Sequence, residues 1–236
     1  MQDKYTGDIG DYAKYGLLRA LSDGRKLGVA WYKFPDERKK PDGRHTAYLQ
    51  RPDLWRARDP ELFDTLKGIV ESGRRKVAEI ECPRILGDAR FSGEELSCKE
   101  SSYIKRCEWR SNWFAKVQRD LQGCDLVFAD PDNGLCEDGK FKDGKKKYWK
   151  RIPLREAIAL AEGRTAIIYH HNSRLKGGHK KEVSYWIELL GAETIALRWR
   201  AYSARTFFII NPTPDIHDTL GKFAKEWGEK ADFHQL

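Results

Sequence analysis

The stretch Cys124–Gly139, CDLVFADPDNGLCEDG, changes abruptly from apolar to polar residues. Its apolar half predicts a buried strand, and residues 130–134, DPDNG, follow directly. The carboxylates of Asp130 and Asp132 are hard oxygen ligands of the kind that magnesium or manganese prefers. Alternatively, Asp130 could accept a hydrogen bond from a substrate amine, or the pentapeptide could be a plain strand-exit turn.

Two further groups of polar residues follow predicted strands at residues 27–34 (LGVAWYKF) and 165–169 (TAIIY). Carboxylates after the first strand could accept hydrogen bonds from ribose hydroxyls or from the amino group of a cofactor. Imidazole, amide and guanidinium groups after the second could contact a substrate, although adjacent residues of one strand point to opposite faces. The residues concerned are Asp36, Glu37 and His45 after the first strand, and His171, Asn172 and Arg174 after the second.

The N-terminal segment TGDIGDYAKYG, residues 6–16, leads into a predicted helix and includes its first residues. Asp11 is expected to cap a helix over Tyr12–Leu21, because an aspartate in this place accepts hydrogen bonds from unpaired backbone amides. The two Gly-Asp pairs are compatible with ordinary cap and turn chemistry. Asp8 and Lys14 are also candidates for a lid over a cofactor.

Predicted strands and helices alternate along most of the chain, which indicates a mainly parallel sheet covered on both faces. The last two strands are joined by only residues 201–204, too few for a parallel crossover, so this pair must be antiparallel. The expected fold class is therefore α/β, a Rossmann-like three-layer sandwich with a mostly parallel sheet and a C-terminal antiparallel strand pair. A single domain over residues 1–236 is expected, with 35–58 and 82–100 as loop or insertion elaborations.

In such a sheet, ligands bind at the carboxyl ends of the strands, so the three polar groups are expected to share one rim. Besides the elements already named, the sequence predicts helices at Pro60–Ser72, Ser102–Leu121, Pro153–Glu162, Gly178–Leu190 and Asp215–Glu229, and strands at Lys76–Glu81, Asp125–Ala129, Glu193–Arg200 and Arg205–Asn211.

A net charge of +8 and a pI near 9.1 favour a polyanionic partner, because phosphate contacts supply most non-specific affinity for nucleic acids. Residues 102–119 and 140–151 interleave lysine and arginine with aromatic residues, a pattern typical of single-strand binding. Trp149 is the ring expected to contact the nucleic acid, which could be RNA or DNA.

No apolar run reaches the roughly 20 residues needed to cross a bilayer, and the N-terminus lacks the features of a secretory signal. The expected location is therefore cytoplasmic, with no membrane partner. The five cysteines are odd in number and include no C-x-x-C pair, which argues against a disulfide framework and a standard zinc site.

Residues 7–18, GDIGDYAKYGLL, together with the pair Asp130-Pro131, resemble bacterial methyltransferases that modify the exocyclic amine of adenine in large-subunit ribosomal RNA. The resemblance implies S-adenosylmethionine as cofactor, a nucleic-acid substrate, and Lys14 near the lysine of a helix that covers the cofactor. It also places the catalytic element, which reads Asp-Pro-Pro-Tyr in that family, at residues 130–133. Asp130 and the carbonyl of Pro131 would accept hydrogen bonds from the amine, whereas Asp132 and Asn133 replace the second proline and the stacking ring.

Three functions fit this pattern. The first is a nucleic-acid base methyltransferase, with Asp8, Lys14, Asp36 and Glu37 around the cofactor. The second is a metal-dependent nuclease or phosphoesterase. The third is a relative that binds nucleic acid or another protein without catalysis. In the second function, magnesium, manganese or zinc would be held by carboxylates and imidazoles from Asp36, Glu37, His45, Asp130, Asp132 and His171.

Overall fold

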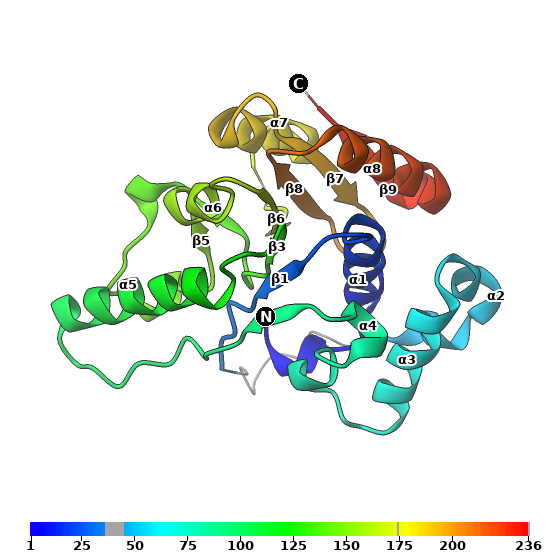
Figure 1. Ribbon diagram of the computed structural model, residues 1–236, viewed down its shortest axis with the longest axis horizontal. Helices are drawn as coiled ribbons and strands as arrows, with labels where there is room; N and C mark the ends of the chain where they lie inside the picture. Colours follow the sequence, from blue (N-terminus) through cyan, green and yellow to red (C-terminus); the bar gives the residue numbers. More distant parts are fainter. Residues whose placement is uncertain (36–44, 174, 236) are drawn as a thin grey trace.

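The computed structural model describes residues 1–35, 45–173 and 175–235 and has a seven-stranded sheet at its centre (Figure 1). The strand order is β2-β1-β3-β6-β8-β7-β9. The pairings from β2 to β6 are parallel, whereas β8 is antiparallel to both β6 and β7, and β9 is antiparallel to β7. The expected Rossmann-like α/β fold is therefore confirmed. The strands of this sheet are β1 (Leu27–Ala30), β2 (Arg90–Ser92), β3 (Leu126–Ala129), β6 (Thr165–His171), β7 (Ile195–Trp199), β8 (Arg205–Ile210) and β9 (Ala231–His234).

Helices cover both faces of the sheet, and β3 shows how its sequence requires this arrangement (Figure 1). Side chains alternate along a strand, so Leu126 and Phe128 enter the core under α1, α3 and α8. Val127 and Ala129 enter the opposite core, under α5, α6 and α7. The helices are α1 (Ile9–Leu21), α2 (Pro52–Trp55), α3 (Pro60–Glu71), α4 (Pro83–Leu86), α5 (Tyr103–Asp120), α6 (Leu154–Leu160), α7 (Gly178–Leu190) and α8 (Pro214–Trp227).

Local signals placed several elements correctly. Helix α7 has the predicted bounds, and Gly191 ends it with a φ of 116° that favours glycine. Helix α3 begins after Asp59 as expected, because the Asp59 carboxylate accepts a hydrogen bond from the amide of Leu62 at 3.0 Å. The strand pair β7–β8 is antiparallel, as its short connection requires.

The start of α1 differs from the prediction. Asp8, rather than Asp11, is the cap: its carboxylate accepts from the amides of Gly10 and Asp11 at 2.7 and 3.1 Å. Asp11 lies inside the first turn, where its carboxylate is turned toward the amide of Gly7 and toward Lys14. The helix therefore begins one turn earlier than expected and carries Asp11 into the interior.

Other differences concern short elements. The predicted strand Lys76–Glu81 is wrong, because Val77–Glu79 form a 3₁₀ turn. Residues 82–100 contribute β2, an edge strand of the central sheet, and β9 adds a further edge that was not predicted. A second, two-stranded sheet pairs β4 (Leu135–Cys136) with β5 (Ile152–Pro153) and fixes the loop that follows β3.

Within the described ranges of the chain, no helix is both long and apolar enough to span a bilayer.

Candidate functional site

A cavity of about 330 Å³ opens at the carboxyl ends of β3 and β6. The strand order reverses between β1 and β3, and open α/β sheets bind ligands in the crevice outside such a reversal. Five residues between Met1 and Lys14 line one wall, and residues 130–133 form the floor after β3. The remaining wall consists of His45, Tyr169, His171, Ser203 and Arg205.

Met1 lies between the ends of β1 and β3 and lines the cavity. Its amino group donates hydrogen bonds to the carbonyl oxygens of Tyr32 and Asp130, at 2.9 and 3.0 Å, and its own carbonyl accepts from the amide of Phe34. The side chain is buried. Met1 therefore links the ends of β1 and β3.

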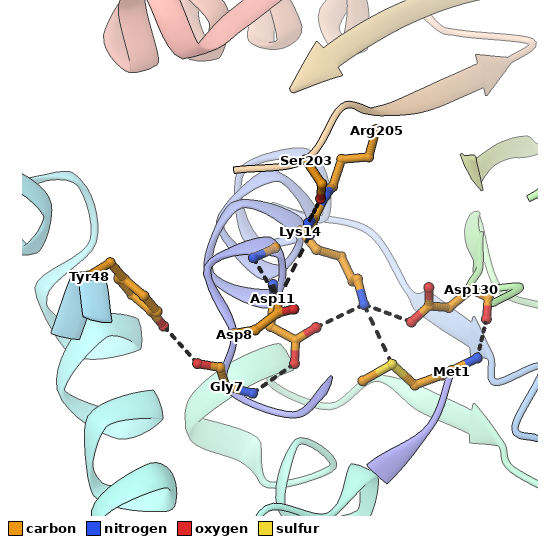
Figure 2. A network of polar contacts seen from close by, with 10 residues as sticks. Met1, Gly7, Asp8, Asp11, Lys14, Tyr48, Asp130, Ser203 and Arg205 are labelled. Carbon is orange, nitrogen blue, oxygen red and sulfur yellow. Dashed lines mark hydrogen bonds and ion pairs between the residues drawn. The ribbon is translucent and has the colours of Figure 1, made fainter. Parts of the chain in front are cut away.

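Lys14 is the centre of a buried charged group that we call the Lys14 cluster: Asp8, Asp11, Lys14, Asp130 and Arg205 (Figure 2). The Lys14 ammonium binds Asp11 at 2.9 Å and Asp130 at 2.7 Å. Burial opposes its charge, but the two carboxylates outweigh burial and raise the pKa of Lys14 well above its ordinary value. Lys14 is therefore a fixed cation rather than a nucleophile or a base.

Asp11 carries a carboxyl group whose pKa is shifted toward neutrality. Burial raises the pKa of Asp11 to about 6, although the nearby Lys14 ammonium acts in the opposite direction. A proton on Asp11 would leave Lys14 paired with Asp130 alone. The charge of the cluster thus depends on pH near 6.

Asp130 keeps one carboxylate oxygen for a ligand. One oxygen is held by Lys14, and no described residue donates a hydrogen bond to the other. The side chain is buried but belongs to the cavity floor. The Asp130 carboxylate is therefore a hydrogen-bond acceptor whose orientation is fixed by the Lys14 ammonium.

Arg205 enters the cavity from the start of β8 and rests on the backbone of α1. A side chain at Gly10 would begin 1.1 Å from its Nη1 atom, so only glycine leaves room for the guanidinium. Its Nη1 atom lies 3.9 Å from Asp8, its Nη2 atom donates to Ser203, and its buried Nε atom has no partner among the described residues. The guanidinium is therefore incompletely paired beside a cavity.

Asp132 and Asn133 are held differently from Asp130. The Asp132 carboxylate accepts from the amide of Gln2 at 2.7 Å and lies 3.5 Å from the Lys150 ammonium. Asn133 is exposed, and its backbone amide donates to the carbonyl of Lys150. Asp132 is thus already engaged by two residues of the protein.

The two adjacent histidines of β6 point to opposite faces of the sheet, as the strand period requires. His171 lines the cavity, and burial together with the Arg205 guanidinium lowers the pKa of His171. His170 is buried under α7, where its Nδ1 atom accepts from the amide of Leu135 at 3.0 Å and its Nε2 atom donates to Glu182 at 3.2 Å.

His170 belongs to a second polar group, which we call the Glu182 cluster: the buried residues His170, Asn172, Glu182 and Thr206 together with the exposed Ser173. Glu182 accepts from the amide and hydroxyl of Ser173, from the amide of Asn172 and from His170, and Asn172 accepts from Thr206. Burial favours the neutral acid, but the hydrogen bonds from His170 and Ser173 outweigh it and lower the pKa of Glu182 to about 2.

The structure brings most of the predicted site residues together. Asn172 is not among them, since it belongs to the Glu182 cluster, and Trp149 also lies elsewhere. Asp36, Glu37 and Arg174 lie outside the described residues. Those that line the cavity are Asp8, Lys14, His45, Asp130, Pro131, Asp132, Asn133 and His171.

Trp149 is fully buried and stacks on Trp109 with ring centroids 5.1 Å apart. Trp113 is also buried. The expectation that Trp149 stacks on bases is therefore not met in this structure, because its ring belongs to the core under α5. The lysines around it, at 140 and 145–147, are exposed.

Sequence reasoning missed six residues that line the cavity: Met1, Tyr5, Asp11, Tyr169, Ser203 and Arg205. Asp11 was taken as a helix cap, and Tyr169 as the last residue of a buried strand. Arg205 begins a predicted strand and belongs to no local motif. Only the insertion of β8 next to β6 brings it near Asp8.

Among the described residues, no three histidines, cysteines, aspartates or glutamates gather closely enough to hold a metal ion. The donor chemistry explains this result. Lys14 already occupies the space between Asp11 and Asp130, and Lys150 lies beside Asp132. The carboxylates that a metal would need are thus neutralised by side chains of the protein.

No protein-family model matches this sequence, and no curated protein does so either. The geometry of the cavity is therefore the basis for its function.

Proposed function

We propose that the protein is an S-adenosylmethionine-dependent methyltransferase that acts on the exocyclic amine of a nucleic-acid base. The observation that carries the proposal is the position of Asp130. It follows the strand at the reversal of the sheet, lines a cavity, and is held by Lys14 with one carboxylate oxygen left for a ligand. A hydrogen-bond acceptor at this place suits an amine substrate.

The charges on the cavity walls fit a cofactor that carries both signs. The carboxylate of Asp8 suits its ammonium group, and the incompletely paired Arg205 suits its carboxylate. A volume of about 330 Å³ lies in the usual range of about 300–1,000 Å³ for small-molecule sites. When bound there, S-adenosylmethionine would supply an electrophilic methyl group.

The floor of the cavity would orient the amine. The Asp130 carboxylate and the Pro131 carbonyl accept its two hydrogens, which aims the nitrogen lone pair away from the floor. Lys14 restricts Asp130 to one orientation through the 2.7 Å ion pair. Positioning of this kind lowers the barrier without a covalent step on the protein.

The surface charge supports a polyanionic substrate. The net charge is +8, and the lysines at 140 and 145–147 are exposed on the segment that leads from β4 to β5. Such lysines would neutralise phosphates, so affinity should fall as salt rises.

Isothermal titration with S-adenosylmethionine tests the cofactor directly. Saturable binding supports the proposal, and no detectable binding at millimolar ligand overturns it.

Transfer of a labelled methyl group to RNA or DNA then tests the chemistry. Asp130→Asn is expected to lower transfer by about 10²–10⁴-fold while cofactor affinity changes less than about tenfold. Asp138→Asn is the matched control, because Asp138 is an exposed aspartate on the segment that leads from β4 to β5. This variant should retain full activity.

A further inference from the structure

Tyr202 is held in an unfavourable backbone conformation at the tip of the β7–β8 hairpin. Its φ is +65°, and the only other non-glycine residue with positive φ in the described ranges is Asn211. Asparagine tolerates this left-handed region, whereas a bulky side chain in it is strained. Such strain persists only where the surrounding structure imposes it, and it concentrates at functional sites.

The hairpin and its neighbour are fixed by backbone hydrogen bonds. The amide of Ser203 donates to the carbonyl of Ala201 at 2.8 Å, and the amide of Asn172 donates to the carbonyl of Ala204 at 3.2 Å. His45, which faces Tyr202, is tied to the start of α1 because its carbonyl accepts from the amide of Ile9 at 3.0 Å. Tyr202 is thus held in place from both sides.

The ring of Tyr202 does not contribute to either hydrophobic core. It is 57% exposed, and its described ring partner is His45, at a centroid distance of 5.4 Å and an angle of 42°. His45 and Ser203 both line the cavity. A strained, exposed aromatic residue therefore stands at the rim of the cavity without a packing role.

We propose that Tyr202, with His45 beside it, is the surface on which one base of a single-stranded nucleic acid stacks. The ligand is a planar heteroaromatic ring on a phosphate backbone, because an exposed aromatic face can stack on a base and the net charge of +8 suits the phosphates. The inference rests on the proposed function in taking this ring to be the target base. It supplies the stacking group that DPDNG lacks and that buried Trp149 does not offer.

A homopolymer comparison tests the proposal without cofactor. Fluorescence anisotropy would measure the affinity of the full protein for an adenine dodecamer and for an abasic dodecamer of the same length. Tyr202→Leu is expected to weaken binding of the adenine strand about tenfold or more and to leave the abasic strand unchanged, since stacking involves bases alone. Tyr202→Phe, which keeps the ring, should stay within about twofold of the native protein.

Tyr202→Gly separates a binding role from a structural one. Glycine relieves the positive φ, so the melting temperature should rise while affinity for the adenine strand falls. A structural tyrosine would lose stability together with affinity.

Tyr103→Leu is the competing variant, because Tyr103 is also exposed and lies in the basic, aromatic segment of α5. Loss of base-dependent affinity in Tyr103→Leu but not in Tyr202→Leu would overturn the inference. Equal affinity of all variants for both strands would do so as well. Neither result involves S-adenosylmethionine, so failure of cofactor binding overturns the proposed function alone.

Discussion

His170 and His171 are neighbours on one strand, yet His170 belongs to the Glu182 cluster whereas His171 lines the cavity beside the Lys14 cluster. In the Glu182 cluster, no buried side-chain nitrogen or oxygen lacks a partner among the described residues. In the Lys14 cluster, the buried Nε atom of Arg205 lacks one, and Asp130 keeps one acceptor oxygen. The first cluster ties α7 to β6 and β8, whereas the second faces a cavity.

The difference shows that buried charge alone does not identify a functional site. Both clusters contain buried carboxylates and a cationic or imidazole partner. Incomplete pairing beside a cavity is what distinguishes the Lys14 cluster, because unused hydrogen-bonding capacity is costly unless a ligand satisfies it. If the two clusters separate function from stability, substitutions in each should have different effects on ligand binding and on unfolding.

The largest expected effect is the loss of the central cation. Lys14→Met leaves two buried carboxylates without their partner, which should lower the free energy of unfolding by about 3–5 kcal/mol. Urea denaturation measures this change. Adding Asp11→Asn should recover part of it, because one unpaired charge is then removed. A double variant no more stable than Lys14→Met would show that packing, rather than charge, explains the loss.

The pH dependence of stability should differ between the native protein and Asp11→Asn. The folded protein binds the Asp11 proton more tightly than the unfolded chain does, with a pKa of about 6 against an ordinary 3.8. The native protein should therefore lose stability as pH rises from about 4 to 6, by up to about 3 kcal/mol at about 1.4 kcal/mol per pKa unit. Denaturation across this range measures the slope, and parallel curves for the two proteins would contradict the assignment.

Glu182→Gln should affect stability without affecting the ligand. It weakens the hydrogen bonds that Glu182 accepts from Ser173 and His170, which should cost about 1–3 kcal/mol. The pKa of Glu182 is lowered, so its stabilisation is present above pH 4.5 and is lost as pH falls toward about 2. Affinity for S-adenosylmethionine, measured by titration under native conditions, should be unchanged. A loss of affinity in the folded variant would break the distinction between the two clusters.

The smallest expected effect is that of Gly10→Ala, and it concerns cofactor binding. The new methyl group must displace the Arg205 guanidinium, which should weaken cofactor binding about tenfold, or about 1.4 kcal/mol. Gly68→Ala is the matched control, since Gly68 lies inside α3 with open space around it. That variant should gain about 0.5–1 kcal/mol of stability from helix propensity and leave binding unchanged.

Sequence predicted the parts of this arrangement that depend on local signals. The apolar run before Asp130 and the short connection before Arg205 are sufficient to place β3 and to make the last hairpin antiparallel. The rule that ligands bind at carboxyl ends then located the cavity. His171 was placed there for the same reason, whereas Asp8 and Lys14 were expected near a cofactor because the N-terminal segment was interpreted as a lid.

The remaining features depend on contacts distant in sequence. Asp8 and Asp11 both precede helical residues, and Asp8 is the cap of α1 because Asp11 is buried with Lys14, which Asp130 holds across 116 residues of chain. Strand β2 has three residues, too few for a periodic pattern. Trp149 stands among lysines, and only its stacking on Trp109 shows that the ring is buried.

The insertion of β8 between β6 and β7 has a consequence for how the protein folds. The strand that carries Arg205 cannot take its place until β6 and β7 leave a gap for it, and Asp130 meets Lys14 across 116 residues of chain. Contacts so distant in sequence form slowly, because loop closure must precede them. The cavity should therefore be among the last features to assemble, and a ligand bound there would stabilise the completed sheet over every partly folded form.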